Sequence, residues 1–115
     1  MMAESGPYFA IDGYDVSMFT SQREAASWLE AIDVENGAYR FFVADGTELR
    51  LSTAGNVVLV TDEKMGKYPD FLVVHVRHYL LSTNSAKRGK LDATALEQAS
   101  LGELVTAFCK VVGTA

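Results

Sequence analysis

Polar and apolar residues alternate near the start of the chain. The stretch "YFAIDGYDVSMFTS", residues 8–21, contains two short extended runs on either side of Asp12-Gly13. Asp-Gly is a favoured two-residue hairpin turn because both positions tolerate positive φ. The pattern therefore predicts a β-hairpin at this end of the domain.

The period then changes to that of a helix over residues 21–32. Ser21 and Glu24 have the spacing of a capping box, which marks a helix start. One stripe at helical spacing carries the apolar side chains Ala25, Trp28, Leu29 and Ile32. We expect one amphipathic helix that lies on a sheet and is anchored by a buried Trp28.

Three further strands are predicted after this helix. Residues 38–44 and 47–53 flank Asp45-Gly46, the strongest hairpin signal in the chain. The apolar run in residues 56–62 favours a third strand that is covered on both faces or central in the sheet. A series of strands after one helix is typical of an antiparallel meander rather than of βαβ units.

The second half of the chain is predicted to be mainly helical. Residues 64–70 form a polar connector with Gly66 and Pro69. Residues 69–82 follow a helical stripe that starts at Pro69, although their β-branched residues also suit a strand. Residues 83–94 are expected to be a loop. Ser100 and Glu103 repeat the capping box and predict a helix over 100–112, which Gly113 ends.

These elements predict one α+β domain over residues 1–115. The expected order is β-β-α-β-β-β-α-α, with the helices packed on one face of an antiparallel sheet of four or five strands. The chain of 115 residues, 49% of them hydrophobic, is long and apolar enough for a single domain with its own core.

Composition also indicates a compartment. The longest apolar runs, residues 57–60 and 71–74, are far too short to span a bilayer. The first ten residues lack the basic start and apolar core of a signal peptide. Cys109 is the single cysteine, which excludes an internal disulfide. We therefore expect a cytoplasmic protein without a membrane segment.

Charge is distributed unevenly along the sequence. Residues 1–63 hold eleven acids against three bases, a net charge of −8, whereas residues 64–115 hold seven bases against four acids, a net charge of +3. Such a division can steer a basic partner toward one side of a protein. Simple solvation of turns and helix starts is the alternative explanation.

Few residues have the spacing of a catalytic or metal site. His75 and His78, three apart on a predicted helix, can face one metal ion, but no HExxH or cysteine-rich pattern supplies further ligands. Cys109 lies near a helix C-terminus, where the dipole disfavours a thiolate, so we expect an inert thiol. The histidines are more typical of a packing edge beside Arg77. We expect no cofactor and no metal.

A nucleic-acid partner is not expected either. The basic loop "KRGK", residues 87–90, is too short for the footprint that such binding needs, and the chain is acidic overall. Phosphate-binding glycine loops, GxSxG and paired CxxC motifs are absent from the sequence.

Acidic residues gather around the end of the first predicted helix and in the hairpin after it. Paired carboxylates act as an acid and a base only in a cleft that splits their pKa values. An exposed position favours solvation or an acidic recognition surface instead. If they are close in space, the residues that would contact a partner are Glu30, Asp33, Glu35, Tyr39, Asp45 and Glu48.

The order of residues in "AASWLEAIDVENGAYRFFVADGTELRL", residues 25–51, is also distinctive: a helix of the form A-x-x-L-E-x-I-D-V, then Tyr, then x-D-G-x-x-L. Over residues 15–52 this order resembles small bacterial immunity proteins of polymorphic toxin systems. The resemblance implies a small, cytoplasmic, non-enzymatic protein that neutralises a cognate toxin by binding it. It includes no catalytic signature.

Three functions are therefore compared below. The first is an immunity or inhibitor protein whose acidic surface meets a basic partner such as a toxin domain. The second is a structural or oligomerising regulatory domain, because exposed sheet edges pair with other chains and can form a homodimer. The third is a small ligand-binding or enzymatic domain that uses His75, His78 and Asp70.

Overall fold

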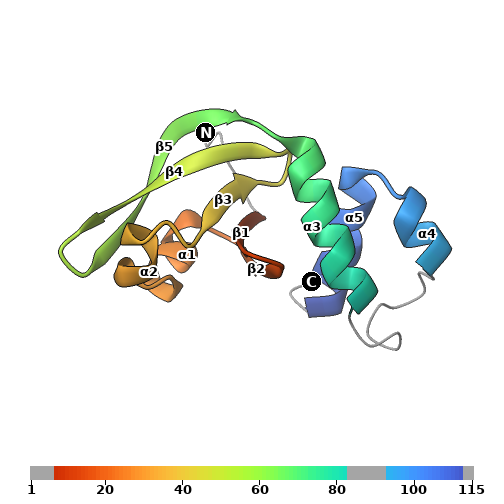
Figure 1. Cartoon of the computed structure of the whole chain (residues 1–115), viewed down its shortest axis with the longest axis horizontal. Coiled ribbons are helices and arrows are strands. Elements are labelled where there is room, and N and C mark those ends of the chain that lie inside the picture. The colour runs from red at the N-terminus through yellow and green to blue at the C-terminus, as the bar shows by residue number, and fades with distance from the viewer. Residues whose placement is uncertain (1–6, 83–92, 113–115) are drawn as a thin grey trace.

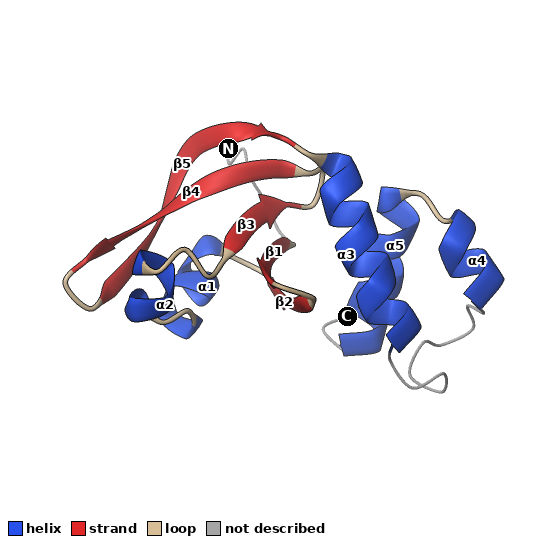
Figure 2. Ribbon diagram, viewed as in Figure 1, coloured by secondary structure: helices blue, strands red, loops and turns tan. Residues whose placement is uncertain are grey.

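The computed structural model describes residues 7–82 and 93–112 and has five strands and five helices there. The elements are β1 (Tyr8–Asp12), β2 (Asp15–Phe19), α1 (Gln22–Trp28), α2 (Ala31–Glu35), β3 (Arg40–Val43), β4 (Thr47–Ala54), β5 (Val57–Lys67), α3 (Pro69–Ser82), α4 (Ala93–Gln98) and α5 (Leu101–Val112). All strands join one antiparallel sheet in the order β2-β1-β3-β4-β5. The predicted α+β class is confirmed (Figure 2).

The helices cover both faces of this sheet, which corrects the expectation of one covered face. Successive side chains of a strand point to opposite faces. In β1, Phe9 packs in a core with α3, α4 and α5, whereas its neighbour Tyr8 packs in a second core with α1. Phe42 and Phe41 of β3 divide in the same way. Figure 1 shows α1 and α2 under the arched β4–β5 hairpin and the other three helices gathered at the far end.

The first predicted helix is interrupted. It forms α1 and α2, and Leu29 between them has an extended backbone with ψ of 147°. The Ser21 cap is confirmed, because its side chain accepts a hydrogen bond from the Glu24 N–H. The interruption turns Ala25 and Leu29 inward, while Trp28 stays 60% exposed. The prediction of a buried Trp28 is therefore wrong.

The third strand of the meander also differs from its prediction. β5 is an edge strand rather than a covered or central one, and it continues into the predicted polar connector as far as Lys67. Its alternate residues Val57 and Leu59 are exposed, whereas Val58 is buried. Polar residues are tolerated here because an edge strand faces solvent on its open side.

The C-terminal helices form the larger core. The prediction of α3 is confirmed, and its buried residues Leu72, Val76 and Leu80 pack with Leu104 and Phe108 of α5. No helix in the described parts of the chain is long and apolar enough to cross a membrane. The predicted loop at 83–94 falls partly, and the "KRGK" segment and Gly113 wholly, outside the described residues.

Helix α4 was not predicted. It has six residues, and tertiary contacts hold it in place. Leu96 is fully buried in the core, and the Arg77 guanidinium donates hydrogen bonds to the Leu96 and Ala99 carbonyls. A basic side chain at a helix C-terminus satisfies carbonyls that have no partner within the helix.

Candidate binding site

The six predicted partner-binding residues do not form one cluster. Glu30, Asp33, Glu35 and Tyr39 lie on or beside α2, which packs near the far part of the β4–β5 hairpin. Asp45 and Glu48 lie at the opposite end of β4, next to the start of α3. Glu35 contacts Thr53, five positions along β4 from Glu48, or roughly 17 Å at the usual rise of a strand.

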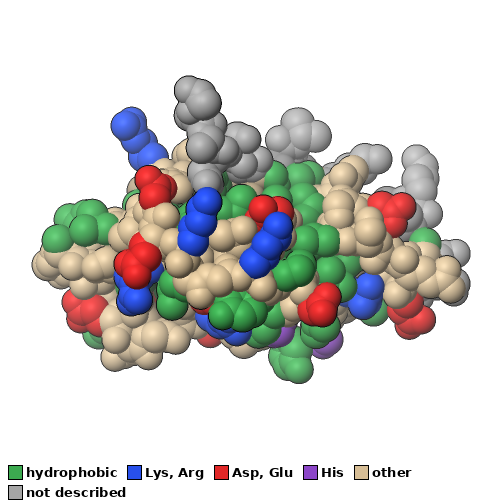
Figure 3. Space-filling view, turned by 90° about the horizontal axis from the view of Figure 1, so that it is seen from above, with side chains coloured by type: hydrophobic (Ala, Val, Ile, Leu, Met, Phe, Trp, Pro, Cys, Tyr) green, Lys and Arg blue, Asp and Glu red, His purple; other side chains and the backbone are tan. Residues whose placement is uncertain are grey.

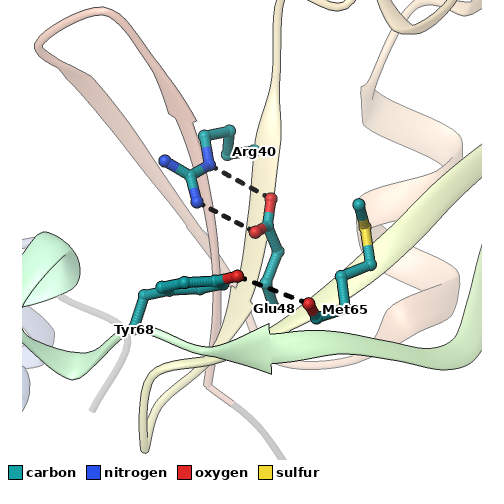
Figure 4. A network of polar contacts seen from close by, with 4 residues as sticks. All are labelled: Arg40, Glu48, Met65 and Tyr68. Atoms are coloured by element: carbon teal, nitrogen blue, oxygen red, sulfur yellow. Dashed lines mark hydrogen bonds and ion pairs between the residues drawn. The ribbon is translucent and has the colours of Figure 1, made fainter.

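Glu48 belongs to a structural network rather than to an exposed surface. It is 8% exposed and accepts two hydrogen bonds, of 3.1 and 2.9 Å, from the Arg40 guanidinium (Figure 4). The same guanidinium lies 4.1 Å from the Phe71 ring centroid, and Tyr68 is also near it. The hydrogen bond to Glu48 raises the pKa of Arg40. This bidentate pair joins β3 and β4 to α3 and leaves Glu48 unavailable to a partner.

Asp45 likewise has partners within the chain. Its carboxylate accepts a hydrogen bond of 2.9 Å from the Thr47 N–H and lies 3.8 Å from the Lys67 ammonium. The Thr47 hydrogen bond is the main cause of its lowered pKa. Asp45 therefore stabilises the β3–β4 turn and is partly neutralised.

Tyr39 lies near three acidic residues, Asp33, Asp12 and Glu30. Its hydroxyl donates a 3.4 Å hydrogen bond to Asp33. Burial, and then the charges of Asp33, Asp12 and Glu30, raise the pKa of the Tyr39 phenol. Three carboxylates thus act on one half-buried ring, a concentration of negative charge that the sequence only partly predicted.

A cavity of about 240 Å³ opens beside this ring. It lies at the turn end of the β1–β2 hairpin, and helices α1 and α3 each add one aromatic residue to its lining, Trp28 and Tyr79. Ala10 and Ser17 are directly opposite each other in the two strands, and because both are small they leave room next to the larger side chains. The full lining is Ala10, Asp12, Asp15, Val16, Ser17, Trp28, Tyr39 and Tyr79. We call this feature the acidic pocket.

Asp12 and Asp15 form the charged part of the acidic pocket. They are exposed cross-strand partners on either side of the Gly13-Tyr14 turn, in which Gly13 has φ of 62°. Like charges directly opposite each other destabilise a strand pair. Among the residues that the structure describes, the three ion pairs involve other acids, so neither aspartate has a cationic partner.

Sequence reasoning missed these two aspartates, although a signal was present. "DGYD" places an acid on each side of a two-residue turn, and antiparallel pairing then brings the two carboxylates face to face. Trp28 was singled out, but for burial rather than for exposure at a cavity.

Glu35 stands apart from the acidic pocket. Its carboxylate accepts a 3.1 Å hydrogen bond from the Thr53 hydroxyl on β4. The contact fastens α2 to the sheet on the side of the hairpin tip. Of the six predicted residues, the structure therefore brings only Glu30, Asp33 and Tyr39 together.

The histidines occupy an aromatic packing edge. Tyr14 stacks on His78 at 4.3 Å and on His75 at 5.5 Å between ring centroids. His75 Nδ1 donates a 2.9 Å hydrogen bond to the Phe71 carbonyl. No group of three or more histidine, cysteine or acidic side chains within the described ranges could hold a metal ion.

Cys109 and Asp70 show no catalytic arrangement. The Cys109 thiol is half-buried and contacts the Met18 sulfur at 3.5 Å. Asp70 is exposed in the first turn of α3, where its charge complements the helix dipole.

Searches for similar proteins leave the site to be interpreted from its own geometry. No protein-family model, no curated protein and no solved structure matches the chain.

Proposed function

We propose that this protein is a non-enzymatic binding protein that engages a basic protein through its acidic pocket and the surrounding carboxylates. One observation carries the proposal: Asp12, Asp15, Glu30 and Asp33 gather around Tyr39 and Trp28 without any ion pair to a described lysine or arginine. Unneutralised charge of one sign speeds the encounter with a partner of the opposite sign and disfavours other partners.

The rest of the surface supports this assignment by contrast. Figure 3 shows acidic and basic side chains interleaved on the face seen from above, beside the β4–β5 strands. On β4 and β5, Arg50 pairs with Glu63 and Lys67 with Asp45. Charges on this side largely offset each other, whereas those around the acidic pocket do not.

The resemblance to immunity proteins suggests what kind of partner this is. A toxin domain that acts on nucleic acid carries lysines and arginines where it meets phosphates. Clustered carboxylates would occupy the same basic surface and so block it. The exposed Trp28 would provide the aromatic anchor that is typical of the centre of an interface.

The proposal is tested by capture from a lysate of the source cells. The full chain, the variant Glu30→Lys/Asp33→Lys and the control Asp70→Lys/Glu97→Lys are immobilised at equal density. The control carries the same charge change on α3 and α4. We expect wild type and control to retain one basic protein that elutes as salt rises, and the first variant to retain little of it. Equal retention by all three would refute the proposal.

Self-association is a second candidate, and the open edge of the sheet favours it. Val57 and Leu59 are 57% and 43% exposed on the edge strand β5. Figure 3 shows hydrophobic side chains gathered at the end of the molecule where the β4–β5 hairpin tip lies. A homodimer by edge pairing predicts a mass in sedimentation that rises with concentration and that Leu59→Lys returns to that of a monomer. A constant monomer mass excludes this candidate.

A further inference from the structure

The acidic pocket has the size of a single side chain. Pockets for drug-sized ligands usually enclose about 300–1,000 Å³, whereas this cavity measures about 240 Å³. Its lining joins two carboxylates and three aromatic side chains, Trp28, Tyr39 and Tyr79, with small residues of the sheet. A ligand that fits must therefore be small, cationic and able to lie against a ring.

The two neighbouring carboxylates of Asp12 and Asp15 favour binding of a cation. Their strands place Asp12 and Asp15 opposite each other, and neither is neutralised by a described residue. A cation between them would turn a repulsive pair into two attractive contacts. A metal ion does not suit this site, because no third metal-binding side chain among the described residues lies beside the two aspartates.

Trp28 gives the second and independent indication. Its side chain is 60% exposed at the rim of the cavity, and its ring lies near that of Phe19, with 5.6 Å between the ring centroids. Large aromatic side chains are usually well buried, so this exposure is informative. Among aromatic rings, that of tryptophan attracts a cation most strongly.

Arginine fits these features better than lysine does. Its planar guanidinium stacks on aromatic faces, offers donors to two carboxylates at once and is more weakly hydrated than an ammonium group. We propose that the acidic pocket receives one arginine side chain of the basic partner, held between Asp12 and Asp15 and stacked on Trp28. This inference rests on the proposed function and names the chemistry by which the partner is recognised.

The test uses the full chain and a single-residue probe. N-acetyl-arginine amide is titrated into the protein while the Trp28 indole N–H resonance is followed by NMR. N-acetyl-citrulline amide has nearly the same shape as the arginine probe but no charge. N-acetyl-lysine amide has the positive charge but lacks the planar guanidinium group. We expect a saturable shift with the arginine probe, a weaker response to the lysine probe and none to the citrulline probe.

Variants locate the site. Asp12→Asn/Asp15→Asn should weaken binding of the arginine probe about tenfold, because both carboxylate acceptors become neutral amides and the attraction between opposite charges is lost. The matched control Asp70→Asn/Glu97→Gln should bind as wild type does. Both aspartate substitutions remove a repulsion, so folding should be retained, as a dispersed NMR spectrum will verify. Equal responses to arginine and citrulline, tighter binding of lysine, or unchanged binding by the aspartate variant would each overturn the inference.

The lysate experiment separates this inference from the proposed function. If the basic protein is retained equally by wild type and by Asp12→Asn/Asp15→Asn, the arginine site is wrong and the acidic surface stands. If the arginine probe binds as expected but no basic protein is captured, the proposed function is wrong and the arginine site stands.

Discussion

Aromatic residues of this chain have two different roles, and exposure distinguishes them. Phe9, Phe41 and Phe42 are fully buried in the central strands of the sheet, where they hold helices against its two faces. Trp28 is largely exposed at the acidic pocket. The first group maintains the fold, and the second is available to a partner.

This difference predicts unequal effects of truncation. Phe41→Ala should lower the free energy of unfolding by about 3–5 kcal/mol, since it leaves a cavity in a core. Trp28→Ala should lower it by about 1 kcal/mol or less, because most of the ring is already in water. Urea unfolding followed by circular dichroism measures both values. A loss above 3 kcal/mol for Trp28→Ala would show that the ring is buried in solution.

Tyr39 reports the charge around the acidic pocket. Because its folded pKa is raised above 10.0, its protonated form favours folding; this contribution is present below the unfolded pKa and is lost as pH rises through the folded pKa. Asp33→Asn should lower the pKa of Tyr39 but not restore its ordinary value, since burial is the largest cause. Ultraviolet titration of tyrosinate, with Tyr39→Phe to assign the signal, measures the change. An unchanged pKa would contradict this placement of Asp33.

The β3–β4 turn approaches the start of α3 closely at Gly46. Gly46 has φ of 95°, and its carbonyl accepts a 2.8 Å hydrogen bond from the Tyr68 N–H. A Cβ atom at Gly46 would lie 2.6 Å from the Pro69 Cα. This turn therefore needs glycine for its conformation and also for the close approach of the helix.

A pair of substitutions separates these two requirements. Gly55→Ala places a side chain at a positive φ in the β4–β5 turn, but its Cβ atom meets no other atom within 4 Å. Gly46→Ala adds the contact with Pro69, so it should reduce the free energy of unfolding by about 1–3 kcal/mol more than Gly55→Ala does. Thermal and urea unfolding provide the comparison. If both variants lose the same free energy of unfolding, then α3 moves aside to accommodate the new Cβ atom at no energetic cost.

Local sequence patterns such as capping boxes and turns predicted most of the helices and strands. The remaining features depend on contacts between residues distant in the sequence. The Ser100 and Glu103 capping box is reciprocal in the structure, as its spacing predicts. The interruption at Leu29 has no glycine or proline to mark it; it arises because Leu29 itself enters the core. Helix α4 depends on Arg77, which lies nineteen positions before its partner Leu96, so no local pattern reveals it.

The candidate site was predicted in part for a similar reason. Acids can be counted from the sequence, but the cations that neutralise them come from other strands. Arg40 removes Glu48 from the surface and Lys67 partly offsets Asp45. Asp12 and Asp15 become adjacent only through strand pairing. Of the predicted residues, Glu30 and Asp33 lie near Tyr39, and Asp12 of the first hairpin lies near it as well.

At the scale of the whole molecule, two buried cores and the proposed binding surface can be distinguished. Helices α3 and α5 pack the larger core against one face of the sheet. The opposite face holds a smaller core with α1, and the acidic pocket takes lining residues from both cores, Ala10 and Val16. Asp12 and Asp15 are exposed, so we expect charge changes there to leave both cores intact.

The most direct test of this account is the dissociation constant of the captured basic protein, measured for wild type and for Glu30→Lys/Asp33→Lys at low and high salt. We predict at least about a tenfold weaker complex for the variant at low salt, a difference of about 1.4 kcal/mol, and a smaller difference at high salt because ions screen exposed charges. Equal dissociation constants at low salt would contradict the central claim that the acidic pocket and its surroundings form the binding surface.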